Sequence, residues 1–278
     1  MRNLSLLILV LVLVLSCSKR VDIPSYKFEV NPKNNLENIQ PFYKEGDNKR
    51  AILFIHGWTG SPSHLKELAL LMNQKGWTVY NIMLTGHGTT LYDMEKATYK
   101  DWIKDAEDSY NKLKEKYDRI SVVGLSMGGS LALYLASKYK VDRVVCIAPA
   151  LIPKNKFAYF VLFLRPLLPR FRFRPERIIK EGEAREYLHE YVGSPTKTII
   201  DLIKIGSLTK RSLKNIDSPV LVIQSKKDEA VDPKVPEIIM KKIKSNNKKI
   251  LWLENSRHIS TTDIERDKIY DEIINFLE

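Results

Sequence analysis

Apolar residues gather in six short runs between residues 51 and 256, and polar or helix-forming stretches separate them. Each run is nearly continuous rather than alternating, which is typical of a strand buried on both faces of a sheet. The repeated change from strand to helix predicts an α/β fold with a doubly wound, mostly parallel sheet. The predicted strands lie in residues 51–57, 78–84, 119–126, 141–150, 218–228 and 248–256.

Three of the remaining segments are predicted to be helices: residues 101–117, 128–139 and 263–278. The alternation is interrupted once, over residues 151–215, which contain no convincing core strand. Ligands of doubly wound sheets bind at the carboxyl ends of the strands. An insertion after the fourth strand is therefore expected to form a cap over the active site.

The start of the chain has the pattern of an export signal. A basic residue precedes an apolar run from Leu4 to Leu15. This run is shorter than the about 20 apolar residues of a membrane-spanning helix, but it fits the apolar core of a signal peptide. The ending, Val-Leu-Ser-Cys17, resembles a bacterial lipoprotein signal, which implies cleavage before Cys17 and lipid attachment to it.

Residues 1–16 are accordingly predicted to be a lipoprotein signal peptide, 17–40 a polar tether, and 41–278 the folded domain. The expected location is outside the cytoplasm, anchored to a membrane. Two or more acyl chains give durable attachment, whereas one gives only marginal binding. An uncleaved signal anchor, or an ordinary signal peptide with a chance cysteine, are the alternatives.

The chain is basic, with a formal net charge of +12. A basic chain can bind nucleic acid or an anionic membrane, or can simply be soluble. No nucleic-acid motif is visible, so a nucleic-acid partner is not expected. The chain has two cysteines, too few for a disulfide framework, and Cys146 lies in an apolar run typical of a buried position.

Residue types suited to nucleophilic catalysis follow three of the predicted strands. Ser126 lies in Gly124-Leu125-Ser126-Met127-Gly128, a G-x-S-x-G sequence between a strand and a helix. That context is typical of a nucleophile elbow, although a glycine-rich turn with an incidental serine is the alternative. Asp228 and His258 follow the fifth and sixth strands.

The order Ser126, Asp228, His258 is that of the α/β-hydrolase triad. Ser126 is the candidate nucleophile, His258 its base, and Asp228 the acid that orients the imidazole. Asp232 precedes a proline and is interpreted as a turn residue. A solvated loop acid is the alternative role for Asp228.

Two backbone N–H groups are predicted to bind the oxyanion: that of Met127, after the nucleophile, and that of Trp58, after the first strand. His56, in the same loop as Trp58, and His87, in a Gly-His-Gly sequence, are interpreted as loop organisers. A general-base role for His56 is the alternative.

Together these residues resemble the α/β-hydrolase superfamily, and more closely its bacterial carboxylesterase and monoacylglycerol-lipase group. The resemblance covers roughly residues 40–278. It rests on the sequences QPFYKEG, HGWTGSP, GHG, DW, GLSMGG, KKDEAVDP and RHISTTD. It implies hydrolysis of carboxylic esters with short or medium acyl chains, or of monoacylglycerols. It also implies a small helical cap at about 151–215 and no metal or organic cofactor.

The cap sequence is apolar and basic, and three roles are open for its aromatic residues. Phe157, Phe160 and Phe163 line an acyl pocket, dock the cap on an anionic lipid surface, or pack onto the protein's own core. The function has alternatives too, because a fold and a triad do not fix the substrate. These are a surface-binding lipoprotein without activity, and acyl transfer or peptide hydrolysis by the same triad.

Overall fold

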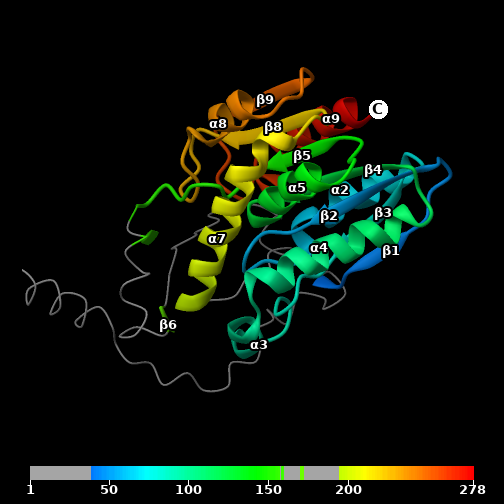
Figure 1. Ribbon diagram of the computed structural model, residues 1–278. Helices are drawn as coiled ribbons and strands as arrows, with labels where there is room; N and C mark the ends of the chain where they lie inside the picture. The colour runs from blue at the N-terminus through cyan, green and yellow to red at the C-terminus, as the bar shows by residue number, and fades with distance from the viewer. Residues whose placement is uncertain (1–38, 157, 160–169, 172–193) are drawn as a thin grey trace, which may run out of the picture.

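The computed structural model describes residues 39–156, 158–159, 170–171 and 194–278 (Figure 1). Cys17, Phe157, Phe160 and Phe163 therefore lie outside the described residues.

A seven-stranded sheet runs through the molecule. Its strands are β1 (Phe42–Lys44), β2 (Arg50–Ile55), β3 (Thr78–Ile82), β4 (Arg119–Leu125), β5 (Val144–Ile147), β8 (Val220–Ser225) and β9 (Lys248–Leu253). The spatial order is β1-β3-β2-β4-β5-β8-β9, in which β1 is antiparallel to β3 and every other pairing is parallel. All six predicted strands are present. The edge strand β1 was not predicted, because three residues are too few to show a pattern.

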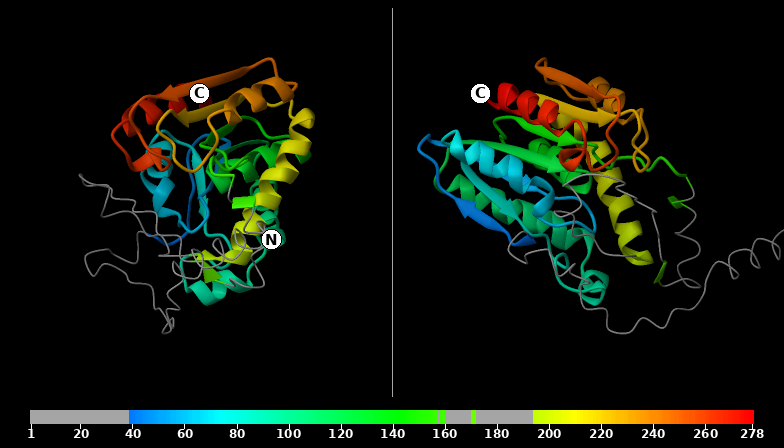
Figure 2. Two further views of the ribbon diagram at one scale, coloured as in Figure 1. Left: turned by 90° about the vertical axis from the view of Figure 1, so that its left-hand side faces the viewer. Right: turned by 180° about the vertical axis from the view of Figure 1, so that it is seen from behind.

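Helices connect the strands and cover both sides of the sheet (Figures 1 and 2). They are α2 (Ser63–Gln74), α3 (Leu91–Lys96), α4 (Tyr99–Lys114), α5 (Met127–Lys138), α7 (Thr196–Ser212), α8 (Val235–Lys242) and α9 (Arg266–Leu277). The helices α4, α5 and α9 occupy the three segments that the sequence predicted to be helical. Within the described part of the chain, no helix has both the length and the apolar character needed to cross a membrane.

Two apolar clusters, one on each face, account for the continuous apolar character of the strands. In β2, Leu53 points to the face covered by α4, α5 and α8, whereas Phe54 points to the face covered by α2 and α9. Leu131 of α5 packs in the first cluster, and Leu68 of α2 and Ile273 of α9 pack in the second; all five side chains are fully buried. Each such burial contributes about 1.5–3 kcal/mol.

The insertion lies between β5 and β8. Its short strands β6 (Arg170–Phe171) and β7 (Ser194–Pro195) pair in antiparallel fashion and lead into α7. The second half of α7 packs on α5: Ile205 is buried in the main core, and the Thr209 hydroxyl donates to the Ser130 carbonyl at 3.1 Å. The first half extends to α3 (Figure 1). The last part of the predicted cap segment therefore belongs structurally to the core.

Candidate active site

Ser126 lies at a sharp turn between β4 and α5, with φ 56° and ψ −113°. A positive φ is unfavourable for a residue with a Cβ atom, so surrounding contacts must hold this conformation. A Cβ atom on Gly124 would lie 2.1 Å from the Gly128 carbonyl oxygen, and one on Gly128 would lie 2.0 Å from the Ile55 carbonyl oxygen. The two glycines therefore let α5 begin directly against β4 and β2, which places Ser126 at the carboxyl end of the sheet.

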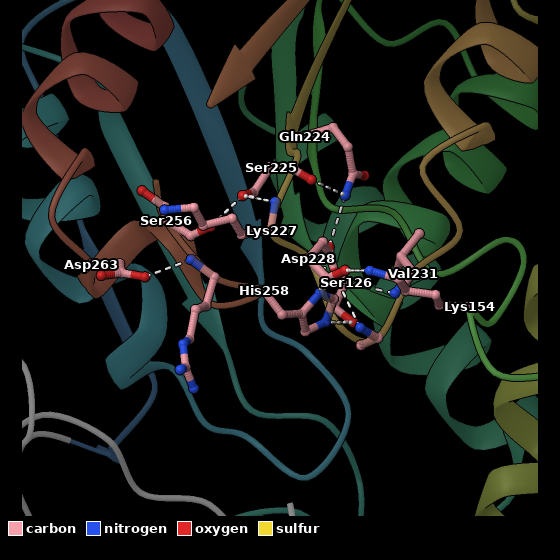
Figure 3. Close-up of polar contacts among 12 residues, drawn as sticks. Ser126, Lys154, Gln224, Ser225, Lys227, Asp228, Val231, Ser256, His258 and Asp263 are labelled. Atoms are coloured by element: carbon pink, nitrogen blue, oxygen red, sulfur yellow. Dashed lines mark hydrogen bonds and ion pairs between the residues drawn. The ribbon is translucent and has the colours of Figure 1, made fainter. Parts of the chain in front are cut away.

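The structure brings together the three residues that the sequence placed after different strands. Ser126 Oγ is 2.9 Å from His258 Nε2, and His258 Nδ1 is 2.9 Å from Asp228 Oδ2 (Figure 3). All three side chains are buried. With Asp228 ionised, Nδ1 carries the proton that it donates to the carboxylate. Nε2 is then free to accept the proton of the Ser126 hydroxyl.

Four hydrogen bonds fix the Asp228 carboxylate. Its Oδ1 accepts from the backbone N–H groups of Ala230 and Val231, at 2.8 and 3.0 Å, and its Oδ2 accepts from Gln224 Nε2 at 2.8 Å as well as from His258. Burial raises the pKa of Asp228, but attraction to His258 and the hydrogen bonds from His258, Val231 and Ala230 outweigh it and lower the pKa to about 2. The group is therefore a carboxylate at neutral pH.

Gln224 is a site residue that the sequence analysis missed. It is the fifth residue of β8, and its amide lies beside the carboxylate four positions later. Nothing in the apolar pattern of this strand distinguishes it from a merely buried polar residue. Asp232 is a turn residue, as expected, because its Oδ1 accepts from the backbone N–H of Lys234 at 2.9 Å.

The loop after β2 lies directly against Ser126. A Cβ atom on Gly57 would be 3.3 Å from the Cβ of Ser126. Trp58 follows in this loop, and Met127 is the first residue of α5. Neither backbone N–H donates to any group among the residues that the structure describes. Two unpaired donors beside a buried hydroxyl suit the oxygen of a tetrahedral intermediate.

His56 organises the same loop, as the sequence analysis predicted. Its Nδ1 donates to the Gly57 carbonyl at 2.8 Å, and its Nε2 accepts from the Leu84 N–H at 3.1 Å. Burial, together with the neighbouring His87 ring 5.0 Å away, holds the pKa of His56 well below its ordinary value. Both ring nitrogens are thus occupied in the neutral form, which leaves none for proton transfer.

His87 is also buried and lies between the rings of His56 and Trp102. Its Nδ1 bonds to the Thr85 carbonyl at 3.2 Å, and burial lowers the pKa of His87 to about 4. In the described residues, no group of His, Cys, Asp and Glu side chains has the arrangement to hold a metal ion.

The fold and the site together define an α/β-hydrolase. The chain belongs to the family described as serine aminopeptidase, S33, which matches residues 46–265. It is 32% identical to a thermostable monoacylglycerol lipase of Bacillus sp. (strain H-257) over 246 residues, which are 87% of this chain and 95% of the relative. It is 29% identical to a carboxylesterase of Bacillus subtilis (strain 168) over 243 residues, 86% of this chain and 96% of that relative.

Solved structures agree with this assignment. The chain superposes with a TM-score of 0.77 on a metagenome-derived lipolytic enzyme that is 31% identical, with 86% of this chain and 97% of the other covered. A monoacylglycerol lipase of Paleococcus ferrophilus gives a TM-score of 0.71 at 17% identity, covering 86% of this chain and 97% of the lipase, and so shares the fold.

Proposed function

We propose that the protein is a serine hydrolase that cleaves carboxylic esters with short or medium acyl chains, or monoacylglycerols, through an acyl-enzyme at Ser126. The observation that carries the proposal is the continuous row of hydrogen bonds from Ser126 through His258 to Asp228, at 2.9 Å each. A binding protein that had lost its activity would not need this row. The lipase and the carboxylesterase at about 30% identity support the choice of an ester over other acyl substrates.

In the first half of the reaction, Ser126 Oγ attacks the ester carbonyl while His258 Nε2 takes its proton. The imidazolium that forms is stabilised by Asp228, which stays ionised because its pKa is about 2. The backbone N–H groups of Trp58 and Met127 bind the oxyanion. His258 then gives its proton to the leaving alcohol, and the acyl group remains on Ser126.

In the second half, His258 removes a proton from a water molecule, which attacks the acyl-enzyme. The same two N–H groups bind the second oxyanion. The acid leaves as Ser126 recovers its proton from His258. The reaction needs no change of oxidation state.

The test is the initial rate of the full chain, in detergent, on p-nitrophenyl esters from acetate to palmitate and on a monoacylglycerol. Ser126→Ala is the matched variant, and it should lower kcat by on the order of 10⁶. An aminoacyl p-nitroanilide and added glycerol test the two other acyl reactions. Faster anilide hydrolysis would favour a peptidase, and acyl-glycerol formation in preference to hydrolysis would favour a transferase. Equal ester rates in both proteins would refute the proposal.

We propose that the acyl chain lies against Phe157, Phe160 and Phe163 in the inserted segment. The support is the place of these residues in the sequence: they belong to the apolar insertion that follows β5, and ligands of such sheets bind at the carboxyl ends of the strands. Phe160→Ala should shift the preferred p-nitrophenyl ester toward longer chains, since a smaller side chain leaves more room. An unchanged preference in all three alanine variants would remove these residues from the pocket.

We further propose that Cys17 is lipidated and that the mature protein is an exported, membrane-anchored lipoprotein. The support is the apolar run and the Leu-Ser-Cys ending of residues 1–17. Metabolic labelling with palmitate should mark the wild-type chain and not Cys17→Ser. A mature chain that begins elsewhere, or equal labelling of both proteins, would contradict the anchor and leave the hydrolase proposal untouched.

A further inference from the structure

The loop that carries His258 is held by a carboxylate that the mechanism above does not use. Glu265, the residue before α9, points back to this loop. Its Oε1 accepts from the backbone N–H of Glu254 at 3.1 Å. Its Oε2 accepts from the backbone N–H groups of Asn255 and Ser256, at 2.8 and 2.7 Å, and from the Ser256 hydroxyl at 2.8 Å. One side chain therefore receives four donors from the three residues that begin the loop.

A second carboxylate completes this arrangement. Asp263 Oδ2 accepts from the backbone N–H of Arg257, the residue before His258, at 2.6 Å (Figure 3). Four successive N–H groups, from residue 254 to residue 257, thus bond to Asp263 or Glu265. None of the four makes a backbone-to-backbone hydrogen bond within the described chain. Residues 254–257 belong to no strand or helix, so the two carboxylates fix the path of this part of the loop.

The same loop is joined to the turn that carries Asp228. The Ser225 hydroxyl donates to the Ser256 carbonyl and accepts from the Lys227 N–H at 3.0 Å (Figure 3). Ser256 is consequently bonded on one side to Glu265 and on the other to the end of β8. A shift of Ser256 would therefore move both His258 and Asp228, whose Nδ1 and Oδ2 atoms form the hydrogen bond that orients the imidazole.

The bonds to Glu265 are charge-assisted, and such bonds are stronger than those between neutral groups. Its side chain is only 15% exposed. Burial raises the pKa of Glu265, but the N–H groups of Asn255 and Ser256 outweigh it and lower the pKa to about 2. Among the described residues, the cation that pairs with Glu265 is Lys268, whose Nζ is 3.9 Å from Oε1 and whose side chain is half-exposed, so the loop provides the main partners of this charge.

We propose that Glu265 is a positioning residue for the reaction: its carboxylate fixes residues 254–256 so that His258 stays in contact with both Ser126 and Asp228. The inference rests on the proposed function only through the roles of Ser126 and His258. A displacement of about 1 Å at a reacting group can cost on the order of 10² in rate. The effect should therefore fall on kcat, with KM little changed, since Glu265 does not contact the substrate.

The test compares the full-length wild type with Glu265→Ala, Glu265→Gln and a control, Glu272→Ala. Glu272 lies on α9 itself, and its carboxylate pairs with Lys249 of β9 at 2.7 Å, away from the His258 loop. We expect kcat to fall by on the order of 10² in Glu265→Ala and to be unchanged in the control. Glu265→Gln should be intermediate, because one amide oxygen can still accept while the amide NH₂ faces an N–H donor. Because glutamine has the size of glutamate, Glu265→Gln can still be measured if the alanine variant does not fold.

The same substitution in a His258→Ala variant distinguishes positioning of His258 from general damage to the structure. On a His258→Ala background, Glu265→Ala should not lower the residual rate further, because it acts through a side chain that is already gone. The rate at which an organophosphonate labels Ser126 is measured in parallel, since it needs the serine and its base but no particular ester. Labelling that falls in step with kcat supports the proposal.

Three results would overturn it: equal kcat in Glu265→Ala and Glu272→Ala, an equal loss with and without His258, or a change confined to KM. A wild type that hydrolyses no ester but labels rapidly at Ser126 would refute the proposed function alone. In that case, the labelling rates of the wild type and the Glu265 variants take the place of kcat in the comparison.

Discussion

The elbow of Ser126 and the loop of His258 meet at one hydrogen bond, but they are held in place by different kinds of interaction. The elbow is fixed by close packing of backbone, with Gly124 and Gly128 too near their neighbours to carry a Cβ atom. The His258 loop is fixed by carboxylates that accept its N–H groups. Packing of this kind does not depend on charge, whereas the second arrangement requires ionised side chains.

The difference divides the reaction into a rigid part and an adjustable part. The nucleophile and the Met127 N–H lie on the packed elbow, where β4, β2 and α5 converge. The base lies on a loop whose position depends on a few polar contacts. We therefore expect changes near Ser126 to alter folding as a whole, and changes near His258 to alter the rate in a protein that is still folded.

Among the changes that distinguish the elbow from the His258 loop, Asp228→Asn has the largest expected effect. The amide can donate to His258 Nδ1 and so favours the tautomer with its proton on Nε2, which cannot accept from Ser126. In a serine protease this change costs on the order of 10⁴ in kcat, and we expect a similar loss here in ester hydrolysis. Circular dichroism should show an unchanged fold. A rate within tenfold of the wild type would mean that Asp228 does not orient His258.

Gly128→Ala should break the elbow instead. The new Cβ would lie 2.0 Å from the Ile55 carbonyl oxygen and 2.6 Å from that of His56. β2 and α5 would have to separate, at a cost of about 3 kcal/mol in the free energy of unfolding. Gly129→Ala is the control, because its Cβ would meet nothing closer than 3.1 Å. Urea denaturation measures both, and equal midpoints would contradict the packing argument.

Ser225→Ala tests the hydrogen bonds that connect the His258 loop to the turn that carries Asp228. It removes the donor to the Ser256 carbonyl and the acceptor for the Lys227 N–H. A lost buried hydrogen bond costs about 1–3 kcal/mol in stability. If the connection also positions His258, kcat of the folded enzyme should fall as well. A loss of stability with full kcat would confine Ser225 to a structural role.

The same division explains how much of the site could be predicted from the sequence. The elbow is local: strand, glycine, serine and helix follow one another within one short segment, so its pattern can be read directly. Asp228 and His258 could be placed because each lies in the loop after an apolar strand, and parallel strands end at one edge. Gln224 and Glu265 could not, because their roles depend on which backbone N–H groups or side chains they meet in the fold. The strand β1 was not predicted for a simpler reason: it is only three residues long.

The pH dependence of stability has the smallest expected effect, but it tests most specifically whether charge holds the His258 loop and not the elbow. The pKa of Glu265 is lowered from its ordinary value of 4.5 to about 2, so the folded state favours the carboxylate. Its contribution to stability is then complete above the unfolded-state pKa and is lost as the pH falls through the folded-state value. The difference in unfolding free energy between wild type and Glu265→Gln should be constant near pH 7 and shrink as the pH falls from about 4.5 towards 2.

Thermal or urea denaturation at a series of pH values measures this difference directly. The Gly128→Ala penalty should stay constant over the same range, because it arises from overlap of atoms and not from charge. A Glu265→Gln difference that did not change with pH would mean that the charge of Glu265 is not what holds the His258 loop. The loop would then have to be regarded, like the elbow, as fixed by packing.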